Sequence, residues 1–282
     1  MGRGAAVELL LWAIAGAAFG ASAWVGRPAT DGAGRAVEGA DGIASALAGN
    51  RSARAQLGVL RAITWNVGGT RDGRPHPFDH GDLDRLAGLL AEHQPDLLLL
   101  QEFRYGMDWP ALRGRLREEG PFIKASGDVA IVALRGELHG GELVGNVALA
   151  EWRIDERTIA VGNVHASAWN ARERRRLIGG AVDRLFAAPG QARLFGGDLN
   201  LDVGQRSDLF SGDPESDVAI YNWVAARLTD VGAAAGPTAE PDRRLDYLFT
   251  SPELRTLHAR VLPDRRGPTM DHDPLELLLV PR

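Results

Sequence analysis

Apolar runs and amphipathic segments follow one another along the chain from residue 59 to its end. Residues 96–103 (DLLLLQEF) form a nearly continuous apolar run, which is typical of a strand buried on both faces. Residues 81–95 carry leucines three and four positions apart and stop at Pro95, a pattern that predicts an amphipathic helix. The same criteria predict strands at 59–69, 129–134, 144–153, 158–164, 192–198, 244–251 and 275–280, and helices at 170–187 and 218–228.

The order of these elements indicates an α/β fold. Helices and strands alternate, but the strands expected between residues 129 and 164 follow one another without a helix. Strands joined by short turns pair antiparallel, so a mixed α/β sandwich is favoured over a purely parallel sheet.

The N-terminal segment differs from the rest of the chain. Residues 9–25 contain no charged side chain and follow Arg3. Their length is near the lower limit for a spanning helix, and a signal peptide ending at residues 21–23 (Ala-Ser-Ala) is the other reading. A hydrophobic helix docked on the domain is a third. We expect residues 1–27 to be a signal or anchor, more an anchor than a cleaved signal, with the rest of the chain secreted or held outside the cytoplasm at the cell membrane.

Residues 28–57 are rich in Gly, Ala, Asp and Arg and show no strong period, although 36–48 could form a short helix. We interpret this stretch as a linker, which leaves residues 58–282 as the folded domain.

Composition narrows the classes of function. The chain has 282 residues, of which 45% are hydrophobic and 24% charged, an ordinary globular composition. It has no cysteine, which excludes disulfides, thiolate metal sites and cysteine nucleophiles. The net charge of −5 argues against a protein that coats nucleic acid through a broad basic surface, but a local basic groove remains compatible with it.

Polar residues recur where apolar strands are expected to end or begin. Strand ends that converge at one edge of a sheet are a usual place for an α/β active site. The residues concerned are Asn66, Gln101, Glu102, Asn163, His165, Asp198, Asn200, Asp246, Asp271 and His272.

The stretch RLFGGDLNLD (193–202) shows this arrangement most clearly. Its two glycines would allow close approach of the backbone. If the segment stays extended, Asp198 and Asn200 lie on the same side of it, because side chains alternate with a period of two.

The strand-end oxygen ligands suit a hard cation. Carboxylate and amide groups with no available thiolate favour Mg²⁺ or Mn²⁺ over zinc. Mg²⁺ usually takes only one or two protein carboxylates, so four carboxylates (Glu102, Asp198, Asp246, Asp271) exceed what one ion requires. Some of them are therefore expected to act as acid–base or orienting groups, a division of roles that suits phosphodiester hydrolysis.

The same residues occur in motifs that resemble the endonuclease/exonuclease/phosphatase superfamily, which includes DNase I-like nucleases, inositol polyphosphate 5-phosphatases and neutral sphingomyelinases. The resemblance covers roughly residues 60–281, and the motifs follow in family order. They are Thr64-Trp65-Asn66-Val67, Gln101-Glu102, Asn163-Val164-His165, Gly197-Asp198-Leu199-Asn200, Leu245-Asp246-Tyr247 and Asp271-His272-Asp273-Pro274.

This resemblance implies a role for each matching residue. Glu102 resembles the principal metal ligand, with Asn66 beside it and Asp271 completing or supporting the metal site. Asp198 resembles the group that takes a proton from the attacking water, with Asn200 aligning it. His272 resembles the residue that binds the phosphoryl oxygen and is oriented by Asp246, and His165 resembles a phosphate contact or leaving-group acid.

The resemblance also implies a four-layer α/β/β/α sandwich with two mixed, mostly antiparallel sheets, and an Mg²⁺- or Mn²⁺-dependent hydrolase that uses in-line water attack. We expect a monomer acting on a phosphodiester, with a nuclease or general phosphodiesterase favoured. One alternative is a sphingomyelinase-like enzyme acting on phospholipids or inositol phosphates at a membrane reached through the N-terminal segment. Another is a non-catalytic binding module on the same scaffold.

Further features of the sequence bear on this interpretation. Met270 replaces the serine that the family usually has before Asp-His, and the stretch between Phe103 and Asp128 is short. In GDLNLD the second Asp is displaced by one position from the calcineurin-like metallophosphatase motif, which argues against that family. Trp169 is either a packing residue or part of a substrate groove, and residues 171–177 (ARERRRL) are more typical of a solvated helix face than of a phosphate-binding surface.

Overall fold

The computed structural model of the protein describes residues 50–68, 70–71, 74–75, 80–115, 122–190, 192–204, 214–240, 242–266 and 270–282. The predicted signal or anchor, most of the predicted linker and the possible helix at 36–48 lie outside these residues. In the part of the chain that is described, no helix is long and apolar enough to cross a membrane.

The first sheet has six strands, and a single neighbouring pair in it, β1 and β4, runs parallel. Helices α4 (His80–His93) and α5 (Tyr105–Arg113) cover its outer face, where Ile63 and Leu100 pack with Leu86 and Leu112. The strands, in order across the sheet, are β14 (Leu254–Val261), β15 (Leu275–Pro281), β1 (Leu60–Asn66), β4 (Leu97–Gln101), β6 (Val129–Ala133) and β5 (Phe122–Ser126).

The second sheet has seven strands, and β10 and β11 are its parallel pair. Helices α6 (Ala171–Ala187) and α7 (Pro214–Ala225) cover its outer face. The strands in order are β12 (Thr229–Asp230), β13 (Asp246–Thr250), β11 (Ala192–Asp198), β10 (Arg157–His165), β9 (Val147–Ile154) and β7 (Glu137–His139), with β8 (Leu143–Val144) paired beside β9. A small separate hairpin consists of β2 (Thr70–Arg71) and β3 (Arg74–Pro75).

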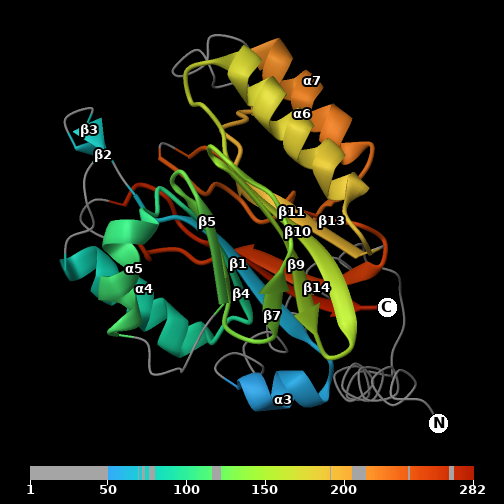
Figure 1. The fold of residues 1–282 in the computed structure, drawn as a ribbon. Helices are drawn as coiled ribbons and strands as arrows, with labels where there is room; N and C mark the ends of the chain where they lie inside the picture. Colours follow the sequence, from blue (N-terminus) through green and yellow to red (C-terminus); the bar gives the residue numbers. More distant parts are fainter. Residues whose placement is uncertain are drawn as a thin grey trace, which may run out of the picture.

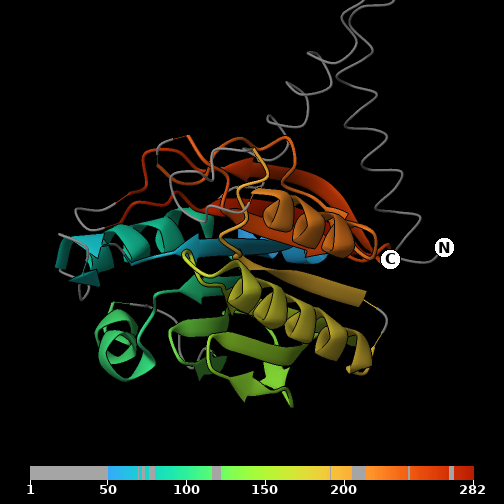
Figure 2. The ribbon, with the colours of Figure 1, turned by 90° about the horizontal axis from the view of Figure 1, so that it is seen from above.

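The two sheets pack face to face. One cluster of apolar side chains lies between them and contains residues of both sheets, among them Leu97 and Leu277 from the first and Trp152 and Val161 from the second. The helices lie on the two outer faces, so the layers follow in the order helix, sheet, sheet, helix (Figures 1 and 2). The predicted mixed α/β fold with two mixed, mostly antiparallel sheets is confirmed.

This topology gathers strand ends at one edge of the sandwich. The parallel partners β1 and β4 end together at Asn66 and Gln101, and β10 and β11 end together at His165 and Asp198. β13 runs antiparallel to β11 and therefore begins at this edge, with Asp246 opposite Asp198.

Part of the predicted linker is folded. Residues 51–56 form helix α3, although the boundary between linker and domain was placed at residue 58. Arg54 of this helix is fully buried, and its guanidinium lies 3.9 Å from the buried Asp96 carboxylate. A composition rich in Gly, Ala and Arg does not reveal that an arginine is buried against a carboxylate, and residues 51–56, which were predicted as linker, belong to the folded domain.

Candidate active site

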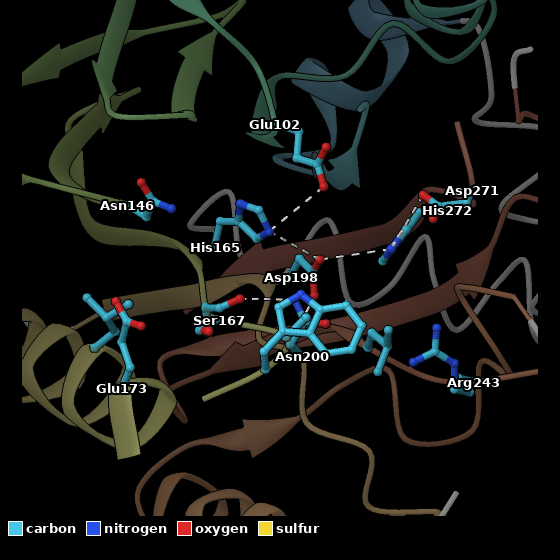
Figure 3. A pocket seen from close by; sticks show the side chains of 15 residues that line it. Glu102, Asn146, His165, Ser167, Glu173, Asp198, Asn200, Arg243, Asp271 and His272 are labelled. Carbon is cyan, nitrogen blue, oxygen red and sulfur yellow. Dashed lines mark hydrogen bonds and ion pairs between the residues drawn. The ribbon is translucent and has the colours of Figure 1, made fainter. Parts of the chain in front are cut away.

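A pocket opens at the edge where the strand ends meet (Figure 3). Six of the predicted site residues line it: Glu102, His165, Asp198, Asn200, Asp271 and His272. The other two, Asn66 and Asp246, are hydrogen-bonded to residues that line it. The structure thus brings all eight predicted residues together from segments far apart in the sequence.

Asp198 occupies the centre of this group. It is the last residue of β11 and is 1% exposed. Its Oδ2 accepts a hydrogen bond from Asn66 Nδ2 at 2.9 Å, and its Oδ1 accepts one from the backbone N–H of Asn200 at 3.0 Å. Burial raises the pKa of Asp198 to about 6, because the nearby His272 charge offsets the loss of hydration only in part. At neutral pH Asp198 is therefore a carboxylate with unusually high proton affinity.

His272 and Asp246 form a buried pair beside it. His272 Nδ1 lies 2.7 Å from Asp246 Oδ2, which leaves Nε2 directed toward Asp198 Oδ2 at 3.9 Å. Burial alone would lower the pKa of His272, but the charge of Asp246 and its hydrogen bond raise it to about 10. His272 is therefore an oriented imidazolium with one N–H available to a ligand.

His165 forms a second imidazole–carboxylate pair. Its Nδ1 lies 2.7 Å from Asp128 Oδ2, and its Nε2 lies 3.7 Å from Asp198 and 3.9 Å from Glu102. Burial opposes the charged form, but the hydrogen bond to Asp128 and the surrounding carboxylates raise the pKa of His165 to about 9. Asp128 was not predicted as a site residue, because a Gly-Asp pair before a strand reads as an ordinary turn.

Glu102 follows the end of β4 in an unusual backbone conformation. Its φ is +53°, in the left-handed region that costs energy for residues other than Gly and is often found at functional sites. Its carboxylate lies against Gly68, where an added Cβ would be 2.2 Å from Oε2. Asn66 Nδ2 donates to Glu102 Oε1 at 3.1 Å as well as to Asp198. Gly68 thus leaves the space that lets the Glu102 carboxylate reach Asn66.

Asn200 reaches the site by a different geometry from the one predicted. Its φ is +49°, so residues 198–200 are not an extended segment and strand alternation does not explain their common side. The backbone N–H of Asn200 instead donates to Asp198 Oδ1. The side-chain Nδ2 of Asn200 donates to the Ala166 carbonyl at 3.0 Å. The glycines act as expected, because an added Cβ at Gly197 would lie 2.1 Å from the Val164 carbonyl.

Asp271 lies at the solvent side of the group. Its side chain is 51% exposed, and its Oδ1 is 3.8 Å from His272 Nε2. It belongs to the surroundings of His272, and the buried carboxylate–imidazole group whose ligand atoms lie within 4.8 Å of one another consists of Asp198, Asp246 and His272.

Other polar residues at this edge were not assigned a role from the sequence. Gln101 Nε2 donates to Asn163 Oδ1 at 2.6 Å, and Asn163 Nδ2 donates to carbonyls of β4 and β6, so this buried pair joins the two sheets beneath the pocket. Arg243 is the single arginine among the described residues that line the pocket. Its Nε and Nη2 donate to the Glu240 carbonyl.

The charges of this group fit a divalent cation. Five carboxylates (Glu102, Asp128, Asp198, Asp246 and Asp271) surround three cationic side chains (His165, His272 and Arg243). Asp246 Oδ1 is buried and has no hydrogen-bond partner within the described part of the chain, which a buried carboxylate oxygen rarely tolerates. Glu102, whose carboxylate lines the pocket next to Asn66, is a suitable place for the ion.

The comparisons with known proteins agree with this fold. Residues 63–268 match the model of the endonuclease/exonuclease/phosphatase family. The comparison with curated proteins gave no match.

Solved structures with a similar fold include an endonuclease/exonuclease/phosphatase from Beutenbergia cavernae DSM 12333. It is 18% identical with a TM-score of 0.61, and the match covers 79% of this chain and 72% of that one. A humanized D. rerio TDP2 with 14 mutations is 19% identical with a TM-score of 0.60, over 79% of this chain and 99% of that one. D. rerio TDP2 complexed with single strand DNA product is 19% identical with a TM-score of 0.57, over 78% and 98%.

These structures are too distant in sequence to show more than the fold, but the family model spans most of the chain and includes most of the residues that build the pocket. The chain therefore belongs to the endonuclease/exonuclease/phosphatase family, a family of phosphoester hydrolases.

Proposed function

We propose that the protein is a phosphodiester hydrolase that works with Mg²⁺ or Mn²⁺. The observation that carries this proposal is the position of Asp198 Oδ2, a buried carboxylate oxygen within 3.9 Å of the Nε2 atoms of both His165 and His272. A group that accepts a proton thus lies beside two groups that can donate hydrogen bonds to a phosphate. Such a set matches the requirements of water attack on a phosphodiester.

Each side chain has a distinct task in this reaction. Asp198, with its pKa raised to about 6 by burial, takes a proton from the attacking water. The Asn66 side chain and the backbone N–H of Asn200 hold its two oxygens in place. His272 donates its Nε2 hydrogen to a phosphoryl oxygen and stabilises the charge that develops there. His165, held by Asp128, contacts the phosphate or protonates the leaving oxygen.

Glu102 would hold the cation, because it offers carboxylate oxygens in the pocket. Asn66, predicted as a second ligand, donates from Nδ2 to Glu102 and Asp198 and would position both carboxylates. When bound, a divalent ion polarises a phosphoryl oxygen and neutralises part of its negative charge. The excess of carboxylates in the pocket would otherwise repel an anionic substrate.

Within this reaction class we propose a nuclease or general phosphodiesterase that acts outside the cytoplasm. The uncharged stretch 9–25 supports export or anchoring. A similar fold in D. rerio TDP2 has been solved with single strand DNA product, which is compatible with a nucleic acid substrate. The alternative substrate is a phospholipid or inositol phosphate at the membrane.

A substrate panel tests this function. The full-length protein, stripped of metal with a chelator, is assayed on bis-p-nitrophenyl phosphate, DNA, RNA, sphingomyelin and phosphoinositides, before and after addition of Mg²⁺ or Mn²⁺. We expect turnover of bis-p-nitrophenyl phosphate and of at least one nucleic acid only after the metal is added. Metal-independent turnover, or none on any phosphodiester, would contradict the proposal, and turnover of lipids alone would replace the substrate we favour.

A further inference from the structure

One exposed aromatic residue lies in the wall of the pocket. The described part of the chain has four large hydrophobic residues with exposed side chains, Leu143, Val144, Trp169 and Phe186, and Trp169 is the most exposed of them at 73%. Of the four, only Trp169 lines the pocket that contains Asp198 and His272. An exposed indole does not contribute the free energy that its burial would provide. Packing in the core therefore does not explain why Trp169 lies beside the catalytic residues.

The loop that carries Trp169 is held rigidly. It joins β10 to α6, and the fully buried Arg174 donates through Nη1 to the carbonyls of Ser167 at 2.9 Å and Ala168 at 3.1 Å. The other side of the Arg174 guanidinium is fixed by Asp217 at 2.6 Å. A buried ion pair therefore orders the two residues directly before Trp169.

The same loop is tied to the catalytic group from the other side. Asn200 Nδ2 donates to the Ala166 carbonyl at 3.0 Å, and the Ala166 amide donates to the Asp198 carbonyl at 2.9 Å. Asn170 then accepts from the Glu173 amide at 3.0 Å and begins α6. The backbone that carries the indole is thus held relative to Asp198 before any substrate arrives, which lowers the entropy cost of binding.

The other residues that line the pocket suit a planar group with polar edges. Leu177 and Leu245 offer apolar contacts in the pocket, and Ser167, Glu173 and Asn200 offer hydrogen-bonding groups. Nucleobases combine a flat face that stacks on an aromatic ring with edges that exchange hydrogen bonds.

Two classes of ligand bind the face of a tryptophan ring, choline headgroups and nucleobases, and the surroundings of Trp169 favour the nucleobase. A choline headgroup also binds an aromatic face, but choline sites usually surround the cation with several rings. Trp169 is the single aromatic residue among the described residues that line this pocket. The exposed side chains of Arg172, Arg175 and Arg176 in the first two turns of α6 add positive charge next to the loop. Positive charge on this helix attracts the phosphate backbone of a nucleic acid that extends beyond the pocket.

We propose that Trp169, with Leu177 and Glu173, forms a subsite that stacks the nucleobase attached to the scissile phosphodiester. This inference rests on the proposed phosphodiesterase function and narrows its substrate to nucleotides and single-stranded nucleic acids. Trp169 binds substrate and takes no part in proton transfer.

Three chromogenic substrates with the same leaving group test the subsite. Thymidine 5′-(p-nitrophenyl phosphate) carries a base, methyl p-nitrophenyl phosphate carries none, and p-nitrophenyl phosphorylcholine carries choline. For Trp169→Ala we expect kcat/KM on the thymidine ester to fall by about 5- to 150-fold, the range found for loss of one base stack. The methyl ester should be unaffected by the same change, and Trp169→Phe, which keeps a ring face, should retain most of the activity on the thymidine ester.

A binding measurement gives a second readout that does not depend on turnover. Titration with thymidine 5′-monophosphate should quench part of the tryptophan fluorescence of the wild-type protein, and this part should be missing in Trp169→Phe. Phe186→Ala removes an exposed ring outside the pocket and serves as the matched control.

The outcomes separate this inference from the proposed function. If the wild type hydrolyses the methyl ester while Trp169→Ala leaves the thymidine ester unchanged, the subsite is wrong and the phosphodiesterase function stands. Equal losses on all three esters, or a selective loss on phosphorylcholine, also overturn the nucleobase assignment. If the wild type hydrolyses none of the esters, the proposed function fails instead, and the fluorescence titration still judges the subsite.

Discussion

Replacing Asp198 with Asn is expected to lower kcat on phosphodiesters by about 10²- to 10⁴-fold, the usual contribution of a positioned general base. Asn has the same shape as Asp but cannot take a proton from water. The wild-type rate should rise with pH through about 6, because burial holds the pKa of Asp198 at that value and only the deprotonated carboxylate acts as a base. The rise should disappear in the variant. Steady-state kinetics between pH 5 and 8 with saturating Mg²⁺ provide the measurement.

The fold should survive this substitution. Asp198 is buried with its charge only partly offset, so a neutral side chain of equal size removes a desolvation cost as well as an interaction. Circular dichroism and thermal unfolding serve as controls, with Asp183→Asn on the exposed surface of α6 as a matched variant that should keep full activity. Wild-type kcat in folded Asp198→Asn would show that Asp198 is not the base.

Replacing His272 with Gln is expected to reduce kcat by about 10²- to 10³-fold, as does removal of one donor to a developing oxyanion. His272 is an imidazolium at neutral pH, because Asp246 outweighs the effect of burial and raises the pKa of His272 to about 10. Gln keeps an N–H donor but loses the charge. The loss should therefore fall mainly on kcat, with a smaller change in KM.

Asp246 acts through His272 and can be tested separately as a positioning residue. In the wild type the rate should decline only as the pH approaches 10, where His272 loses its proton. Asp246→Asn removes the charge that stabilises the imidazolium, so this decline should move to lower pH. An unchanged alkaline limb in Asp246→Asn, together with normal kcat in His272→Gln, would show that this pair does not contact the phosphate.

Helices and strands were predictable where the spacing of apolar residues in the sequence matches the faces that are buried in the structure. Helix α4 and strand β4 were recognised because leucines at helical spacing and a continuous apolar run match their environments in the sandwich. Helix α5 was missed because it contains Pro110, and β14 was missed because this half-exposed edge strand alternates polar and apolar residues only weakly. In both cases packing against neighbouring elements decides the structure, which a local pattern does not record.

The residues of the site were predictable from the sequence, but the contacts that set their protonation and conformation were not. The strand-end residues were identified from their positions in the family's motifs, and the structure brings them into one pocket. The partners that set their protonation were not identified. Asp128 is 37 positions from His165 in the sequence, and the left-handed backbone of Glu102 and Asn200 reflects tertiary contacts that residue type alone does not specify.

The central claim is that Glu102 holds a divalent cation in the pocket that also contains Asp198 and His272. Anomalous scattering from crystals of the protein equilibrated with MnCl₂ tests it most directly. We predict a manganese peak within about 2.5 Å of a Glu102 carboxylate oxygen, beside Asn66, and loss of this peak in Glu102→Gln. A manganese peak elsewhere in the molecule, or none at Glu102 in crystals saturated with the ion, would contradict the account.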